Sequence, residues 1–182
     1  MDGLDYTFAG LPLHVLLVHV VVVMTPAVGL ALVVIAVWPA ARRVLWIPVL
    51  LAAAVLLPIG LATIEAGKWL EQRVPPAPLI QTHTAQGEDI QPWLFGLLVV
   101  AVLVAAWAVV ELVARRRAAE RASDGEGSRR GLGRGAVIGA SVVLAIAAIG
   151  VTVGSTLTLV SIGESGTRAV WEGSFSDEPL ER

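Results

Sequence analysis

Four long apolar stretches constrain the fold of this chain more than any other feature of its sequence. They cover residues 11–38, 44–64, 93–113 and 136–162, and none of them contains a lysine or an arginine. A helix of about 20 apolar residues crosses the hydrocarbon layer of a bilayer, which is roughly 30 Å thick. The sequence therefore predicts a single all-α domain over residues 1–182, an integral membrane four-helix bundle.

The composition supports a membrane protein and excludes several other classes. Hydrophobic residues make up 56% of the chain and charged residues 15%, with a mean hydropathy of +0.78. Soluble domains carry about 25% charged residues. The net charge of −2 provides no basic surface for phosphate groups, so we expect the lipid bilayer as a partner and no nucleic acid. The absence of cysteine excludes thiolate zinc sites and iron–sulfur clusters.

The basic residues fall mostly on one side of the predicted membrane. Nine of them lie between the first and second stretches or between the third and fourth: Arg42, Arg43, Arg115, Arg116, Arg117, Arg121, Arg129, Arg130 and Arg134. The other side has four, namely Lys68, Arg73, Arg168 and Arg182. Because loops rich in lysine and arginine stay in the cytoplasm, we expect a flexible cytoplasmic linker at 114–135. Both termini are then extracytoplasmic, in a multi-pass protein of the cell membrane.

Five ionisable residues are predicted to gather at the extracytoplasmic end of the bundle. His14 and His19 lie in the first apolar stretch, and Glu65 directly follows the second. His83 precedes the third stretch, and Glu164 follows the fourth. All three histidines of the chain are therefore expected at one end. Each of these groups also has a purely structural interpretation, as an imidazole at the membrane interface or a solvated helix end.

The spacing of the first two histidines predicts that only one of them faces the bundle. Residues five apart in an α-helix differ by about 140° in direction. His19 lies deeper in the predicted membrane, where a polar group facing lipid is more costly. We therefore expect His19 to point inward and His14 to lie at the rim. Gly87 is one helical turn after His83, which leaves space beside that imidazole if the segment is helical.

These residue types suit two kinds of ligand, and the sequence leaves both open. Imidazole and carboxylate groups bind divalent ions such as Zn²⁺, Fe²⁺, Mn²⁺ or Cu²⁺. The predicted metal ligands are His14, His19, Glu65, His83 and Glu164. A b-type haem would need His19 and His83 on opposite faces of the iron, with Gly87 beside it. No catalytic residues are predicted, because the chain has no HExxH motif or similar arrangement.

Two glycines of the fourth stretch are predicted to contribute to helix packing. Gly150 and Gly154 are four residues apart, a spacing that lets helices approach closely in lipid. We expect both to face a neighbouring helix.

Four short motifs resemble an uncharacterised bacterial family, the domain of unknown function 2231. They are LHVLLVH at 13–19, ATIEAGKWLE at 62–71, HTAQG at 83–87 and IGESGTRAVW at 162–171. The resemblance implies a four-helix membrane protein and these motifs as candidate site positions, but no activity. The family commonly has histidine where this chain has Glu164. Glutamate binds metal ions but is a poor axial ligand for a low-spin haem.

Two functions fit these observations about equally. The first is a binding or redox module with a metal ion or haem at the outer end of the bundle. The second is an accessory subunit that packs against a larger membrane complex, for example of the respiratory chain, or against further copies of itself. A transporter is less well supported, because no charged residue lies near the predicted midplane.

Overall fold

The computed structural model describes residues 5–123, 132–176 and 178–179 of the 182-residue chain. A short antiparallel ribbon, β1 (Thr7–Phe8) and β2 (Leu11–Pro12), precedes five helices and one 3₁₀ turn. The helices are α1 (Leu13–Val37), α2 (Pro39–Glu71), α3 (Pro78–Gly87), α4 (Gln91–Ser123) and α5 (Arg134–Trp171). The 3₁₀ turn η1 (Glu88–Ile90) joins α3 to α4, so the two form one nearly continuous helical segment.

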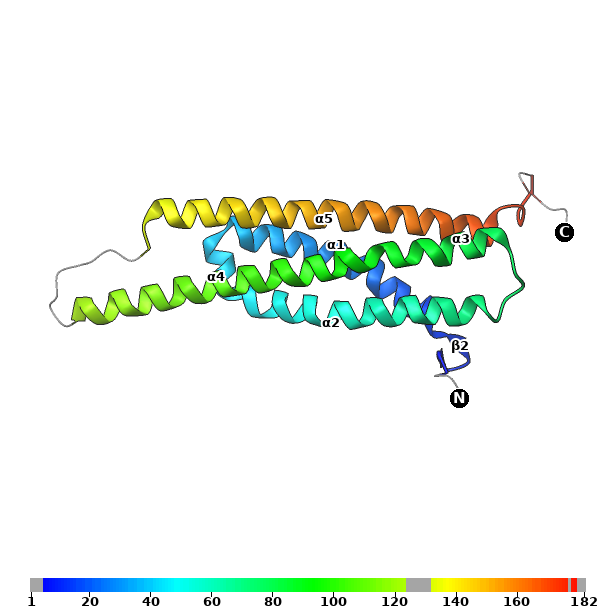
Figure 1. The fold of residues 1–182 in the computed structure, drawn as a ribbon, viewed down its shortest axis with the longest axis horizontal. Helices are drawn as coiled ribbons and strands as arrows, with labels where there is room; N and C mark the ends of the chain where they lie inside the picture. The colour runs from blue at the N-terminus through cyan, green and yellow to red at the C-terminus, as the bar shows by residue number, and fades with distance from the viewer. Residues whose placement is uncertain (1–4, 124–131, 177, 180–182) are drawn as a thin grey trace.

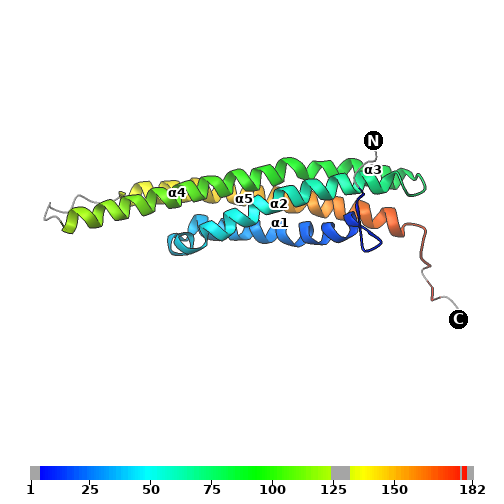
Figure 2. The same cartoon turned by 90° about the horizontal axis from the view of Figure 1, so that it is seen from below.

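The long helices form a four-helix bundle. α1 packs against α2 and α5, and α4 packs against the same two helices from the other side. Figures 1 and 2 show all four running close to one long axis, with α4 and α5 extending beyond the turn between α1 and α2. The ribbon, α3 and the last turns of α5 lie together at the opposite end (Figure 1).

The predicted all-α bundle is confirmed. α2, α4 and α5 extend beyond the predicted stretches, whereas α1 is slightly shorter than the stretch at 11–38. α1, α2, the α3–α4 segment and α5 are each long and apolar enough to cross a membrane. α4 continues to Ser123, so residues 114–123 of the predicted linker are helical instead. Alanine and arginine dominate this segment, and both are strong helix formers. α5 likewise begins at Arg134, while 124–131 of the predicted linker lie outside the described residues.

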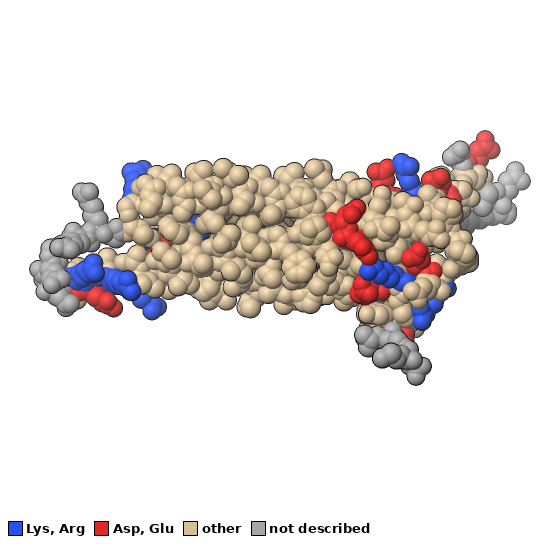
Figure 3. All heavy atoms as spheres, viewed as in Figure 1, with Lys and Arg blue, Asp and Glu red and all other residues tan. Residues whose placement is uncertain are grey.

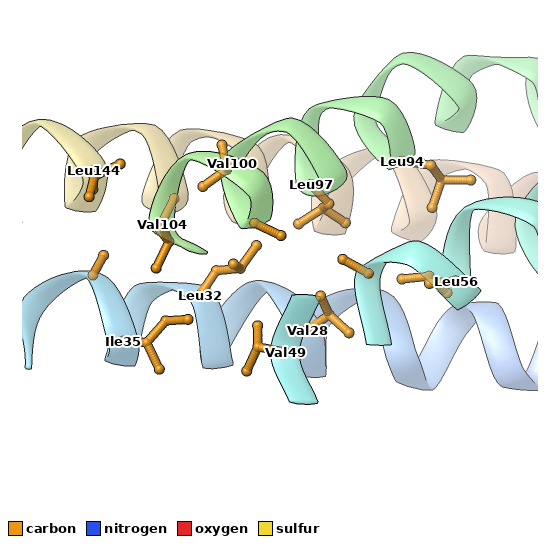
Figure 4. Packing of buried hydrophobic residues seen from close by; sticks show 14 of the residues in the cluster. Val28, Leu32, Ile35, Val49, Leu56, Leu94, Leu97, Val100, Val104 and Leu144 are labelled. Atoms are coloured by element: carbon orange, nitrogen blue, oxygen red, sulfur yellow. The ribbon is translucent and has the colours of Figure 1, made fainter. Parts of the chain in front are cut away.

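A continuous apolar core runs through the bundle and holds the four helices together. Figure 4 shows side chains from all four long helices meeting along its axis. Leu32 of α1 and Val104 of α4 have no exposed surface, and Leu97 has only 1%. Such close packing fixes the helices relative to one another, because voids in a core are costly.

The outer surface of the bundle is apolar as well. Large side chains are exposed on every long helix, for example Val23, Leu51, Val102 and Ile146, each with at least half of its surface accessible. Figure 3 shows charged residues at the two ends and an uncharged band between them on the visible face. An exposed apolar surface of this extent is unfavourable in water and suits a lipid environment.

A buried ion pair, which the sequence analysis did not predict, closes the bundle near the α1–α2 turn. Arg42 of α2 is fully buried and donates to both carboxylate oxygens of Glu111 in α4, at 3.2 and 2.8 Å. Arg42 also donates to the main-chain oxygens of Ile35 and Ala36, both at 2.8 Å. These carbonyls belong to the last turn of α1, where no further helical N–H groups follow. Arg42 also donates to the hydroxyl of Ser141 in α5 at 3.3 Å, so the pair links all four long helices.

The two glycines predicted to face a neighbouring helix differ from each other. A Cβ atom at Gly154 would overlap the indole ring of Trp93, so α5 and α4 approach closely there. This part of the prediction is confirmed. The prediction for Gly150 is wrong, because a Cβ atom there would meet nothing within 4 Å. The helical rotation of about 400° over four residues displaces Gly150 by about 40° from the contact.

Candidate ligand pocket

A pocket of about 290 Å³ lies between α1, α2, α3 and α5, at the end of the bundle that contains α3. Aliphatic side chains and glycines form most of its wall. The polar residues that line it are His14, Thr63, Glu71, His83 and Thr84. An apolar cavity with a few polar groups is typical of small-molecule binding sites.

His14 is held against α2 by one hydrogen bond and one glycine. It is the second residue of α1, directly after the ribbon. Its Nδ1 lies 2.9 Å from the main-chain oxygen of Thr63. Since a carbonyl oxygen can only accept, Nδ1 carries the proton and donates it. A Cβ atom at Gly67 would lie 3.0 Å from this same nitrogen, so any larger residue at this position would displace the imidazole.

His83 is held against α5 in a corresponding way. Its Nδ1 lies 3.0 Å from the hydroxyl oxygen of Ser165, and that hydroxyl donates to the main-chain oxygen of Ile162 at 2.8 Å. A serine hydroxyl has one proton. With that proton directed to Ile162, Ser165 accepts and His83 Nδ1 is the donor. A Cβ atom at Gly166 would lie 2.8 Å from the imidazole.

The two imidazoles face one pocket and lie next to each other. The ring centres of His14 and His83 are 6.2 Å apart, with an angle of 76° between the ring planes. Each Nδ1 is used in a hydrogen bond, whereas neither Nε2 has a hydrogen-bond partner among the described residues. Neither Nε2 is among the fully buried unpartnered atoms of that part of the chain, so both remain accessible.

The prediction that His19 points inward is wrong, and the roles of the first two histidines are reversed. His19 is exposed on α1, and its Nδ1 is hydrogen-bonded to the main-chain oxygen of Val15 at 2.6 Å. This bond to its own helix satisfies the ring N–H without any contact inside the bundle. The prediction considered only depth in the membrane, and it did not consider that Gly67 of α2 makes space for His14 instead.

The two predicted acidic ligands also lie outside the pocket. Glu65 is exposed and pairs with Lys68 at 3.0 Å, one turn along α2. Glu164 is exposed and pairs with Arg168 at 2.8 Å, one turn along α5. Local ion pairs of this kind satisfy a carboxylate at a helix end in water. In the described parts of the chain, no three His, Asp or Glu side chains are arranged to hold a metal ion.

Gly87 does line the pocket, and a Cβ atom there would meet nothing within 4 Å. The space predicted beside His83 thus exists, although the glycine in contact with that imidazole is Gly166. The sequence analysis missed the roles of Gly67, Ser165 and Gly166. All three belong to the four motifs given above. His14 contacts Gly67 and His83 contacts Gly166, so histidines and glycines that recur in separate motifs were the available signal.

Comparisons with known proteins found no match for this chain: no protein-family model, curated protein or solved structure is similar to it at the level of significance required.

Proposed function

We propose that this chain is a multi-pass protein of the bacterial plasma membrane with both termini on the extracytoplasmic side. The support is the apolar surface of the four long helices and the distribution of the arginines. Arg43, Arg115 and Arg116 are exposed at the end where α1 joins α2 and α4 ends. Clusters of this kind favour the cytoplasmic side. A reporter fused to the C-terminus that is active only in the cytoplasm would contradict this orientation.

We propose further that the protein binds a small, largely apolar ligand in the pocket at its extracytoplasmic end. The observation that carries this proposal is the pair of accessible Nε2 atoms, from His14 and His83, on the wall of a largely apolar cavity. Near lipid, an unsatisfied polar atom is costly. A ligand that accepts both lone pairs and fills the cavity would offset this cost.

The four motifs that resemble the domain of unknown function 2231 support the same proposal. Each contributes a residue to the pocket or to its histidines: His14, Gly67, His83 and Gly166. Motifs far apart in the sequence that meet at one site are expected of a shared binding function. We therefore propose that the chain belongs with that family.

Ligand content of the purified protein tests the binding proposal. The full chain is purified in mild detergent, and its metal content, absorption spectrum and native mass are measured. We expect a ligand in the unmodified protein that is lost in the His14→Ala/His83→Ala variant and retained in His19→Ala. His19→Ala is a matched control, because it removes an exposed imidazole from the same helix. Equal ligand content in all three proteins would contradict the proposal and favour the accessory-subunit alternative.

A further inference from the structure

The hydrogen bonds of the two histidines determine what kind of ligand they can hold. Both Nδ1 atoms are donors, to the Thr63 carbonyl and to the Ser165 hydroxyl. In a neutral imidazole the other nitrogen then has a free lone pair. Histidines that bind metals show this arrangement, in which the second ring N–H is fixed by a carbonyl or a similar acceptor. The pocket thus presents two electron-pair donors from different helices.

The number of ligands argues against a metal ion bound by side chains alone. Structural zinc sites use four protein ligands and catalytic sites three. In the described part of the chain His14 and His83 are two, and no third histidine or acid is placed to complete a metal site with them. A metal that brings its own equatorial nitrogen ligands needs only two from the protein, one on each side.

The distance between the rings fits ligation from opposite sides. Metal–nitrogen bonds are about 2.0 Å, and the centre of an imidazole lies about 1.1 Å behind its Nε2. Two imidazoles in line through one metal therefore have centres about 6.2 Å apart, and two at a tetrahedral angle about 5 Å apart. The observed separation of 6.2 Å agrees with the linear arrangement.

We infer that the ligand of this pocket is a b-type haem, with the Nε2 atoms of His14 and His83 as its two axial ligands. This inference depends on the proposed binding function and names its ligand class. The apolar wall suits a porphyrin, and Gly87 leaves open space in that wall. The enclosed volume of about 290 Å³ is smaller than a porphyrin. One edge of the macrocycle therefore extends through the open side of the pocket.

Titration of the ligand-free full chain with ferric haem b tests the inference by absorption and electron paramagnetic resonance. We expect binding of one haem per chain with the six-coordinate, low-spin signature of two imidazoles. His14→Ala and His83→Ala should each convert the signal to five-coordinate, high-spin haem and weaken binding at least tenfold. His19→Ala should leave both the signal and the affinity unchanged.

Rescue separates ligation from a structural effect of the substitutions. Added imidazole should restore the low-spin signal in His83→Gly, because it can replace the missing side chain. Wild-type protein that gives no low-spin signal, or one unchanged in both histidine variants, would overturn the inference. An edge-to-face contact between the rings without any metal would give that result. A different ligand, found in the purified protein and lost in the double histidine variant, would overturn haem as the ligand while leaving the binding function intact.

Discussion

The ion pair between Arg42 and Glu111 should be the most sensitive point of the fold. Replacing Arg42 by methionine leaves a buried carboxylate with one remaining partner, the indole N–H of Trp107 at 3.1 Å. It also leaves the two last-turn carbonyls of α1 without their side-chain donor. Breaking a buried pair on one side costs about 3–5 kcal/mol. We therefore expect Arg42→Met to lower the free energy of unfolding by about 4 kcal/mol.

The double variant Arg42→Met/Glu111→Leu should be much less damaging than either single one. It removes both charges, so the remaining loss is the hydrogen bonds from Arg42 to the α1 carbonyls and Ser141 and from Trp107 to Glu111, about 1–2 kcal/mol. The coupling between the two sites should then exceed about 2 kcal/mol. Arg43→Met is the matched control. Within the described residues its exposed side chain donates only to the Pro39 carbonyl, so its effect should stay within about 0.5 kcal/mol.

Unfolding of the detergent-solubilised protein by added dodecyl sulfate, followed by tryptophan fluorescence, measures these free energies. The reasoning is refuted if Arg42→Met is no less stable than Arg43→Met. It is also refuted if the double variant loses the sum of the two single losses, since the charges would then not compensate each other.

The other predictions use glycine pairs as internal controls, and each compares two positions on α5. Gly166→Ala should destabilise by about 1 kcal/mol because its methyl group meets an imidazole, whereas Gly163→Ala, in open space, should stabilise by about 0.5–1 kcal/mol through helix propensity. Gly154→Ala should cost about 1–3 kcal/mol because the methyl group overlaps an indole ring, and Gly150→Ala should not destabilise. The same dodecyl sulfate titration checks both pairs, and equal effects within either pair would contradict the packing described.

Much of the fold could be predicted because it depends on length and hydrophobicity. Twenty or more apolar residues in a row predict a membrane helix whatever its neighbours are, and four such runs in one chain predict a bundle. Helix ends were harder to predict. The extension of α4 to Ser123 depends on local helix propensity, which a hydropathy pattern does not report.

The position of the site along the bundle axis could be predicted, but the side chains that point into it could not. The sequence placed all three histidines at one end, but which of His14 and His19 faces inward depends on how α1 is rotated against α2. Gly67 decides that rotation by leaving space for an imidazole. The acids illustrate the same limit. Glu65 and Glu164 lie at the expected end of the bundle, yet each is exposed and has a basic partner one turn away.

The polar groups inside the two ends of the bundle differ in how completely they are hydrogen-bonded, and this difference supports the proposed function. Arg42 and Glu111 have several partners each and no exposed surface beyond 3% of either side chain. The hydrogen-bonding groups of this pair have partners, and the pair holds the helices together. At the other end, His14 and His83 are each fixed by one nitrogen while the second remains accessible without a partner. A purely structural polar pair would be expected to satisfy both nitrogens, so this difference supports the proposed binding site at that end.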